Sequence, residues 1–99
     1  MHRVILWSPL AEKDLGNILG YLSKNGSQRV IIRFLDKIDI ATKQIAKVPN
    51  QYPIINRNLH VRKCVLTKQN TLFYREVEKR IEILRIFDTR QDPNKLKFK

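Results

Sequence analysis

The stretch SPLAEKDLGNILGYLSKNGS, residues 8–27, determines how the chain begins to fold. Ser8 followed by Pro9 is typical of a helix start, because serine caps free backbone amides and proline fits the first helical position. The apolar residues that follow repeat at helical spacing in one stripe: Ala11, Leu15, Ile18, Leu19 and Leu22. The Asn-Gly pair at 25–26 ends this pattern. We therefore expect an amphipathic helix that stops at a sharp turn.

A second helix is expected directly after this turn. Ser27 can cap it, and its apolar stripe contains Val30, Phe34, Ile38, Ala41, Ile45 and Val48. Residues 25–27 then connect a helical hairpin. Gly16 and Gly20 lower the helix propensity of the first helix but would allow a neighbour to pack closely against it.

Strand-like patterns flank the hairpin on both sides. The β-branched run RVILW, residues 3–7, precedes it, and the two prolines of PNQYP indicate a loop over residues 49–58. Three strand-like runs follow: LHVRKCVLT (59–67), TLFYREV (71–77) and RIEILRIFD (80–88). The short connections KQN and EK suit tight hairpins, so these three runs predict an antiparallel meander.

The predicted fold class is α+β, with the element order β-α-α-β-β-β in a single domain over residues 1–99. One curved sheet packs on the helical hairpin. The N-terminal strand pairs at an edge of the sheet or beside the last strand.

The charge of the chain favours a polyanionic or acidic partner. Lys and Arg number 20 against 9 Asp and Glu, which gives a formal net charge of +11. Cys64 is the single cysteine, so an intrachain disulfide is excluded and a structural zinc site is not expected. The apolar run of residues 4–7 is too short for a signal peptide or a membrane span. We expect a cytoplasmic protein without a membrane, metal or cofactor requirement.

Several of these segments together resemble the RelE/ParE superfamily of type II toxin-antitoxin systems. They are the tryptophan followed by SPLAEKDLGNILGYL, then VRKCVL, LFYREV and the ending ILRIFDTRQDP. The resemblance spans essentially the whole chain. It implies a small growth-inhibiting toxin with a curved sheet, an association with plasmid stabilisation, and a cognate antitoxin that binds the toxin in a hetero-oligomer.

The superfamily divides by target, and this sequence departs from its messenger RNA endonucleases. Those enzymes place basic residues on the central strands and use a tyrosine or histidine near the scissile phosphate. Here Thr71 stands where an active-site arginine is expected, and no tyrosine follows Tyr74. The resemblance therefore favours a ParE-like action on DNA gyrase. A ribosome-dependent, metal-free endonuclease and a degenerate, non-toxic binding module remain the alternatives.

The candidate site residues are basic side chains with more than one possible role. RNA cleavage would need a stabiliser of phosphorane charge and a proton donor or acceptor. The weak catalytic candidates are Arg62, Lys63, Arg75, Arg90 and His60, and the candidates for binding the target are Arg62, Lys63, Arg75, Arg90, Arg33 and Lys37. Each could instead belong to a solvated helix or sheet face.

The polar cluster that ends the last strand has a structural explanation. Asp88 and Thr89 can satisfy turn amides, and Asp92 before Pro93 favours extended backbone. Arg90 is expected to project from this end of the sheet, where a phosphate or an antitoxin carboxylate could reach it.

Overall fold

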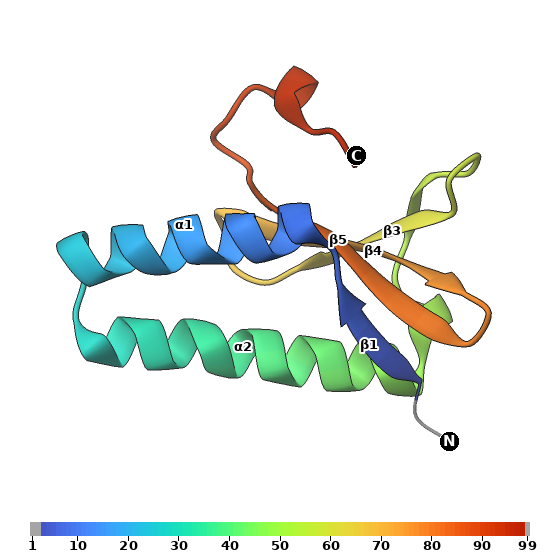
Figure 1. Cartoon of the computed structure of the whole chain (residues 1–99), viewed down its shortest axis with the longest axis horizontal. Coiled ribbons are helices and arrows are strands. Elements are labelled where there is room, and N and C mark those ends of the chain that lie inside the picture. The colour runs from blue at the N-terminus through green and yellow to red at the C-terminus, as the bar shows by residue number, and fades with distance from the viewer. Residues whose placement is uncertain (1–2, 99) are drawn as a thin grey trace.

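The computed structural model describes residues 3–98 and has the expected order of one strand, two helices and a run of strands (Figure 1). The helices are α1 (Pro9–Asn25) and α2 (Gln28–Lys47). The strands are β1 (Val4–Trp7), β2 (Ile54–Asn56), β3 (Val61–Val65), β4 (Asn70–Val77) and β5 (Arg80–Asp88). Two 3-10 turns cover Pro49–Gln51 and Pro93–Lys95. The predicted α+β class is confirmed.

Two serines begin the two helices, as the sequence predicts. The Ser8 hydroxyl accepts a hydrogen bond from the Ala11 amide at 3.0 Å, and the Ser27 hydroxyl accepts one from the Val30 amide at 3.3 Å. The expected stripe of α2 is buried at Phe34, Ile38, Ala41 and Ile45. These caps and stripes fix where each helix starts and which side faces the sheet.

The expectation of close packing at the two glycines of α1 is wrong. A Cβ atom added to Gly16 or to Gly20 would meet no heavy atom within 4 Å. Both positions are exposed on the outer side of α1. Within residues 3–98 these glycines therefore lower helix propensity without a compensating contact.

The five strands form one open mixed sheet in the order β1-β5-β4-β3-β2. β1 runs parallel to β5, so it is both the edge strand and the neighbour of the last strand, which combines the two predicted places. The other neighbouring pairs are antiparallel. Glu78 and Lys79 join β4 to β5 with positive φ values of 50° and 66°, as a tight hairpin requires.

The predicted loop over residues 49–58 contains a strand that the sequence pattern did not indicate. Residues 54–56 form β2, which pairs with β3. The strand expected over residues 59–67 is correspondingly shorter, because a turn precedes it. In this turn the Asn56 side chain accepts a hydrogen bond from the Leu59 amide at 3.0 Å, and His60 adopts a φ of 57°.

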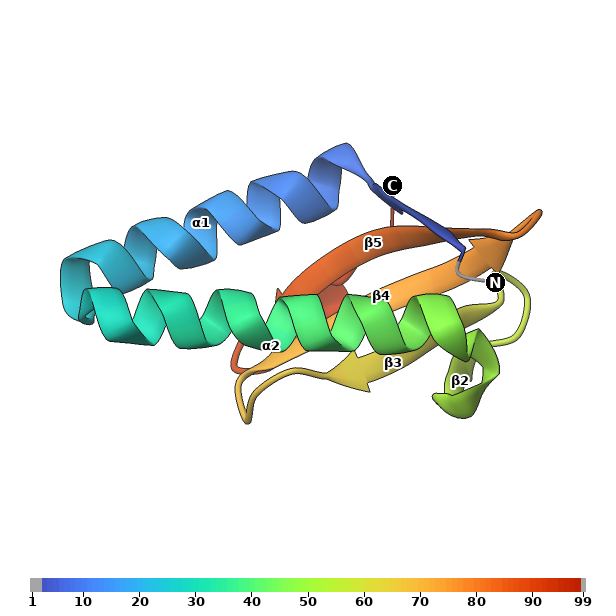
Figure 2. The ribbon, with the colours of Figure 1, turned by 90° about the horizontal axis from the view of Figure 1, so that it is seen from below.

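Both faces of the sheet are covered. The two helices diverge from their connecting turn and lie across one side, where Ile45, Leu72 and Tyr74 are fully buried (Figure 2). The opposite face carries a smaller apolar cluster of Val61, Phe73, Leu84 and Phe87, against which Leu96 and Phe98 pack. The sheet is therefore the middle layer, with the helical hairpin on one side and the C-terminal segment on the other.

Candidate functional site

A groove of about 500 Å³ lies where the helical hairpin meets one end of the sheet. Its walls come from α1, α2, the turn between β3 and β4, and the end of β5. Apolar residues form part of its lining: Ile18, Leu22, Val30, Phe34 and Ile86. Polar and charged side chains line the rest. A concave site that combines apolar residues with polar groups is a common form of binding site.

The cations at this groove differ in how they are paired. Arg33 and Lys37 lie one turn apart on the exposed side of α2, and neither forms an ion pair within residues 3–98. Arg90 stands at the end of β5 and is paired with Asp88. A fourth cation of the lining, Arg85, is paired with Asp14. The groove therefore has two positive charges without an ion-pair partner among residues 3–98 and two that are paired with aspartates.

Arg90 lies exposed at the end of the sheet, as expected from sequence, but its side chain is held by an ion pair. Its guanidinium folds back on the Asp88 carboxylate, with Nη2 donating at 2.7 Å and Nε donating at 3.0 Å, and its backbone amide donates to the same carboxylate at 2.9 Å. These hydrogen bonds from Arg90 hold the pKa of the Asp88 carboxyl below its ordinary value. The side chain of Arg90 nevertheless remains 56% exposed. Asp88 therefore presents Arg90 to the groove in a fixed orientation.

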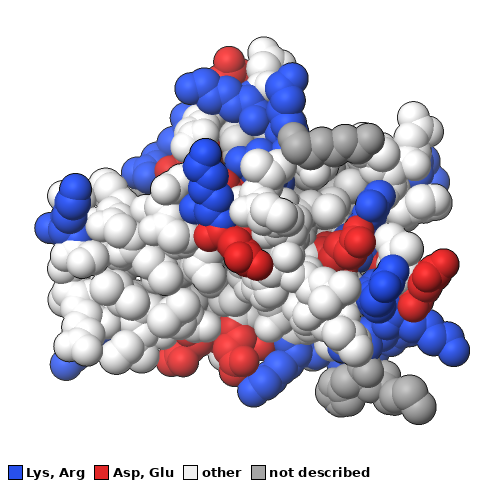
Figure 3. All heavy atoms as spheres, viewed as in Figure 1, with Lys and Arg blue, Asp and Glu red and all other residues white. Residues whose placement is uncertain are grey.

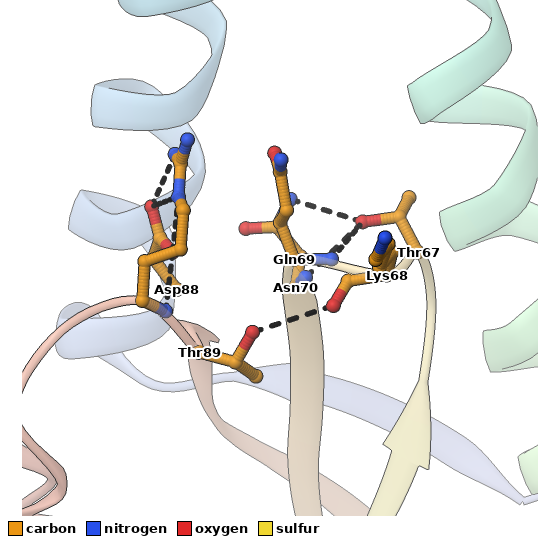
Figure 4. A network of polar contacts seen from close by, with 7 residues as sticks. Thr67, Lys68, Gln69, Asn70, Asp88 and Thr89 are labelled. Carbon is orange, nitrogen blue, oxygen red and sulfur yellow. Dashed lines mark hydrogen bonds and ion pairs between the residues drawn. The ribbon is translucent and has the colours of Figure 1, made fainter.

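The turn between β3 and β4 forms the facing wall and is held by Thr67. The Thr67 hydroxyl accepts hydrogen bonds from the backbone amides of Gln69 and Asn70 at 3.2 and 3.1 Å (Figure 4). Thr89 then ties this turn to the end of β5, because its amide donates to the Gln69 carbonyl at 2.8 Å. The two walls of the groove are thus joined at their base.

A partly buried ion pair joins α1 to β5 in the lining of the groove. The Arg85 guanidinium donates to the Asp14 carboxylate at 2.7 and 3.0 Å, and the Ile86 amide donates to the same carboxylate at 3.0 Å. These bonds raise the pKa of Arg85 above its ordinary value. Sequence reasoning missed this pair. The available signal was the position of Asp14, three residues after Ala11 and four before Ile18, within the apolar stripe.

The family of the chain follows from comparison of its sequence with family models. Residues 5–93 match the model described as the ParE toxin of the type II toxin-antitoxin system parDE. The chain belongs to this ParE toxin family. Comparison with curated proteins finds no matching sequence.

Solved structures with the same fold agree with the family assignment. A chain of the chromosomal ParDE system from P. aeruginosa aligns with a TM-score of 0.72 at 22% identity, over 88% of this chain and 96% of that one. The YoeB/ParE toxin from Agrobacterium tumefaciens gives 0.62 at 14% identity, over 86% and 96%. A chain of the E. coli DinJ-YafQ toxin-antitoxin complex gives 0.63 at 12% identity, over 91% and 96%. At these identities the likeness concerns the fold.

Four of the five catalytic candidates of this ParE-family toxin lie outside the groove. Arg62 donates to the Tyr52 carbonyl at 2.7 Å, which ties it to the segment before β2. Arg75 pairs with Glu82 at 2.7 Å. Lys63 follows Arg62 on β3 and therefore points to the opposite face, and His60 is exposed in the turn before β3. None of these four residues lines the groove that contains Arg33, Lys37 and Arg90.

The strand tyrosine of the toxin is enclosed. The hydroxyl of Tyr74 donates to the Pro49 carbonyl at 2.6 Å, and the residue is fully buried. Burial raises the pKa of this phenol further above its ordinary value. A phenol that is already engaged and shielded from water is poorly suited to proton transfer with a bound RNA.

Among residues 3–98, no group of three or more His, Cys, Asp or Glu side chains is placed to hold a metal ion. No helix in that range is long and apolar enough to cross a membrane.

Proposed function

We propose that this toxin of the ParE family inhibits growth by binding DNA gyrase in the cytoplasm, and that a cognate antitoxin neutralises it by occupying the groove. The observation that carries the proposal is the placement of Arg33, Lys37 and Arg90 around one apolar groove. Such a surface binds a macromolecule without needing an acid, a base or a metal.

Charge supports this choice of partner. The chain has a formal net charge of +11, and Arg33 and Lys37 have no carboxylate partner within residues 3–98. In the view of Figure 3, Lys and Arg gather around the C-terminal segment at the top and again at the lower right. An acidic, amphipathic antitoxin segment would satisfy both the cations and the apolar lining of the groove, and could fold as it binds.

Gyrase and the antitoxin would compete for the toxin, because both are proposed to bind at the same groove. If Arg33, Lys37 and Arg90 contact gyrase, an antitoxin seated on them prevents that contact. Arg62, Lys63 and Arg75 are proposed as secondary contacts to the target, because they lie on strands outside the groove. Plasmid stabilisation is the proposed role of the gene pair.

Cleavage of messenger RNA is the second candidate function, because the superfamily that the sequence resembles also contains ribosome-dependent messenger RNA endonucleases. Against it stand the placement of Arg62, Lys63, Arg75 and His60 outside the groove and the enclosure of Tyr74.

Induced expression in cells tests the proposal against this alternative. Expression alone, and with the neighbouring gene, is scored for growth, for the DNA damage response and for loss of messenger RNA. We expect growth arrest with a DNA damage response that the neighbouring gene relieves. Loss of messenger RNA without DNA damage would favour the endonuclease, and unchanged growth would favour a non-toxic binding module.

A further inference from the structure

The second face of the sheet is covered by Leu59, from the turn before β3, and by the last residues of the chain. There the apolar cluster of β3, β4 and β5 packs against Leu96 and Phe98. The helices lie on the other side of the sheet, and the C-terminal turn lies away from α2 (Figure 1). An apolar strip of the sheet therefore depends in part on a short terminal segment for its cover.

The segment binds this strip through a defined set of contacts. The Phe98 ring meets the Phe73 ring edge to face, with 5.7 Å between ring centroids. Leu96 packs on the same cluster, two residues earlier. Between them the Lys97 carbonyl accepts a hydrogen bond from Arg85 Nη1 at 2.6 Å. Alternation along extended backbone places Leu96 and Phe98 on one side and leaves the Lys97 side chain in solvent.

Little else holds the segment to the sheet. Residues 89–95 are all exposed, and the bonds of residues 91–95 are local, such as that from the Asn94 amide to the Asp92 side chain at 3.0 Å. The conformational entropy lost when residues 89–98 become ordered opposes docking of the segment on the sheet. The partly buried side chains of Leu96 and Phe98 and one hydrogen bond favour docking. Segments with few buried contacts open without unfolding the domain.

We propose that this strip is a second interaction surface, which takes an extended protein segment with a leucine and an aromatic residue two positions apart. Residues 96–98 are its resident ligand and show which chemistry fits: an aromatic ring on Phe73, a leucine beside it, and a backbone carbonyl for Arg85. A partner segment of the same pattern takes their place. Asp14 fixes Arg85 from the groove side, so the hydrogen-bond donor is oriented before the partner arrives.

A peptide supplied in trans tests this surface. The probe is a fluorescent peptide spanning residues 90–99, and the control peptide carries Leu96→Ala and Phe98→Ala. The receptor is the full-length chain with the same two substitutions, in which the strip has lost its resident side chains. We expect the probe to bind this chain at least tenfold more tightly than the control peptide does, and to bind the wild-type chain more weakly because the resident segment competes.

Equal binding of the two peptides to the substituted chain would overturn the proposal. If the Leu96→Ala/Phe98→Ala chain misfolds, a measurement on the wild-type chain tests the proposal instead. With 4-fluorophenylalanine incorporated, the Phe98 resonance, assigned through Phe98→Ala, should move to its solvent-exposed position as unlabelled peptide is added. A resonance that stays in place under saturating peptide would overturn the proposal. So would a wild-type dimer that Phe98→Ala dissociates, because the occupant would then be a second copy of the chain.

Discussion

Asp14 and Arg85 form a partly buried ion pair that joins α1 to β5, with both side chains about 15% exposed. The same carboxylate accepts a hydrogen bond from the Ile86 amide. Ile86 lies on β5 beyond the part of that strand that pairs with β1. Asp14 thus closes the part of the β5 edge that the short strand β1 leaves open. At this edge a helix side chain accepts the backbone hydrogen bond that a neighbouring strand would otherwise accept.

Substitution of Asp14 by alanine should destabilise the domain strongly. Arg85 and the Ile86 amide would both lose their acceptor in a partly buried place, so we expect the free energy of unfolding to fall by about 3 kcal/mol. Urea denaturation measures this change. Glu12→Ala is the matched control, because Glu12 is an exposed acid of the same helix. A loss no larger than that of the control would contradict the role given to Asp14.

Removal of the Tyr74 hydroxyl distinguishes a structural role of this group from a catalytic one. In Tyr74→Phe the buried Pro49 carbonyl loses its donor, so the free energy of unfolding should fall by about 1–2 kcal/mol. Growth inhibition should persist at a temperature where the variant is folded. If the folded variant loses growth inhibition, the phenol takes part in the activity and the binding mechanism is wrong.

Alanine at Gly16 or Gly20 should stabilise α1. Neither added Cβ meets an atom within 4 Å, so each change should raise the free energy of unfolding by about 1 kcal/mol through helix propensity. Gly26→Ala is the control, because its Cβ would lie 3.0 Å from the Leu22 carbonyl oxygen and should bring no gain. A loss of stability in Gly16→Ala or Gly20→Ala would refute this reading of α1.

The contribution of the Asp88 and Arg90 pair should depend on pH. Arg90 lowers the pKa of the folded Asp88 carboxyl, so the pair stabilises the fold above the ordinary aspartate pKa of about 3.9, and this contribution is lost as the pH falls through the lowered value. We expect Arg90→Met to be less stable than wild type at pH 7, with a smaller difference at pH 3. Urea denaturation at the two pH values measures it. A difference that grows on acidification would contradict the assignment.

Helices and strands with a distinct capping residue or a regular apolar pattern could be predicted from sequence. Ser8 and Ser27 mark the two helix starts, and the strand of residues 80–88 is found with the bounds expected. β2 was missed because three residues between a proline and a turn give too little alternation to identify a strand. Leu96 and Phe98 stand among lysines, and only contact with Phe73, distant in sequence, gives them a role.

The groove illustrates the same limit at the level of the site. Arg33, Lys37 and Arg90 were each candidates from sequence, and the structure places them around one groove. The pairing of Arg90 with Asp88 and of Arg85 with Asp14 could not be read from spacing alone. The pair of Arg85 and Asp14 depends on how β5 packs against α1, and that of Arg90 and Asp88 on the conformation of the turn after β5, neither of which a single sequence specifies.

The supercoiling activity of purified DNA gyrase, measured with increasing amounts of the purified toxin, tests the central claim most directly. We predict that the wild-type chain inhibits supercoiling, that Arg33→Ala/Lys37→Ala raises the concentration needed at least tenfold, and that Lys43→Ala, an exposed lysine of the same helix paired with Asp39, matches wild type. Unimpaired supercoiling with a folded wild-type toxin, together with cleavage of ribosome-bound messenger RNA by the same sample, would contradict the account.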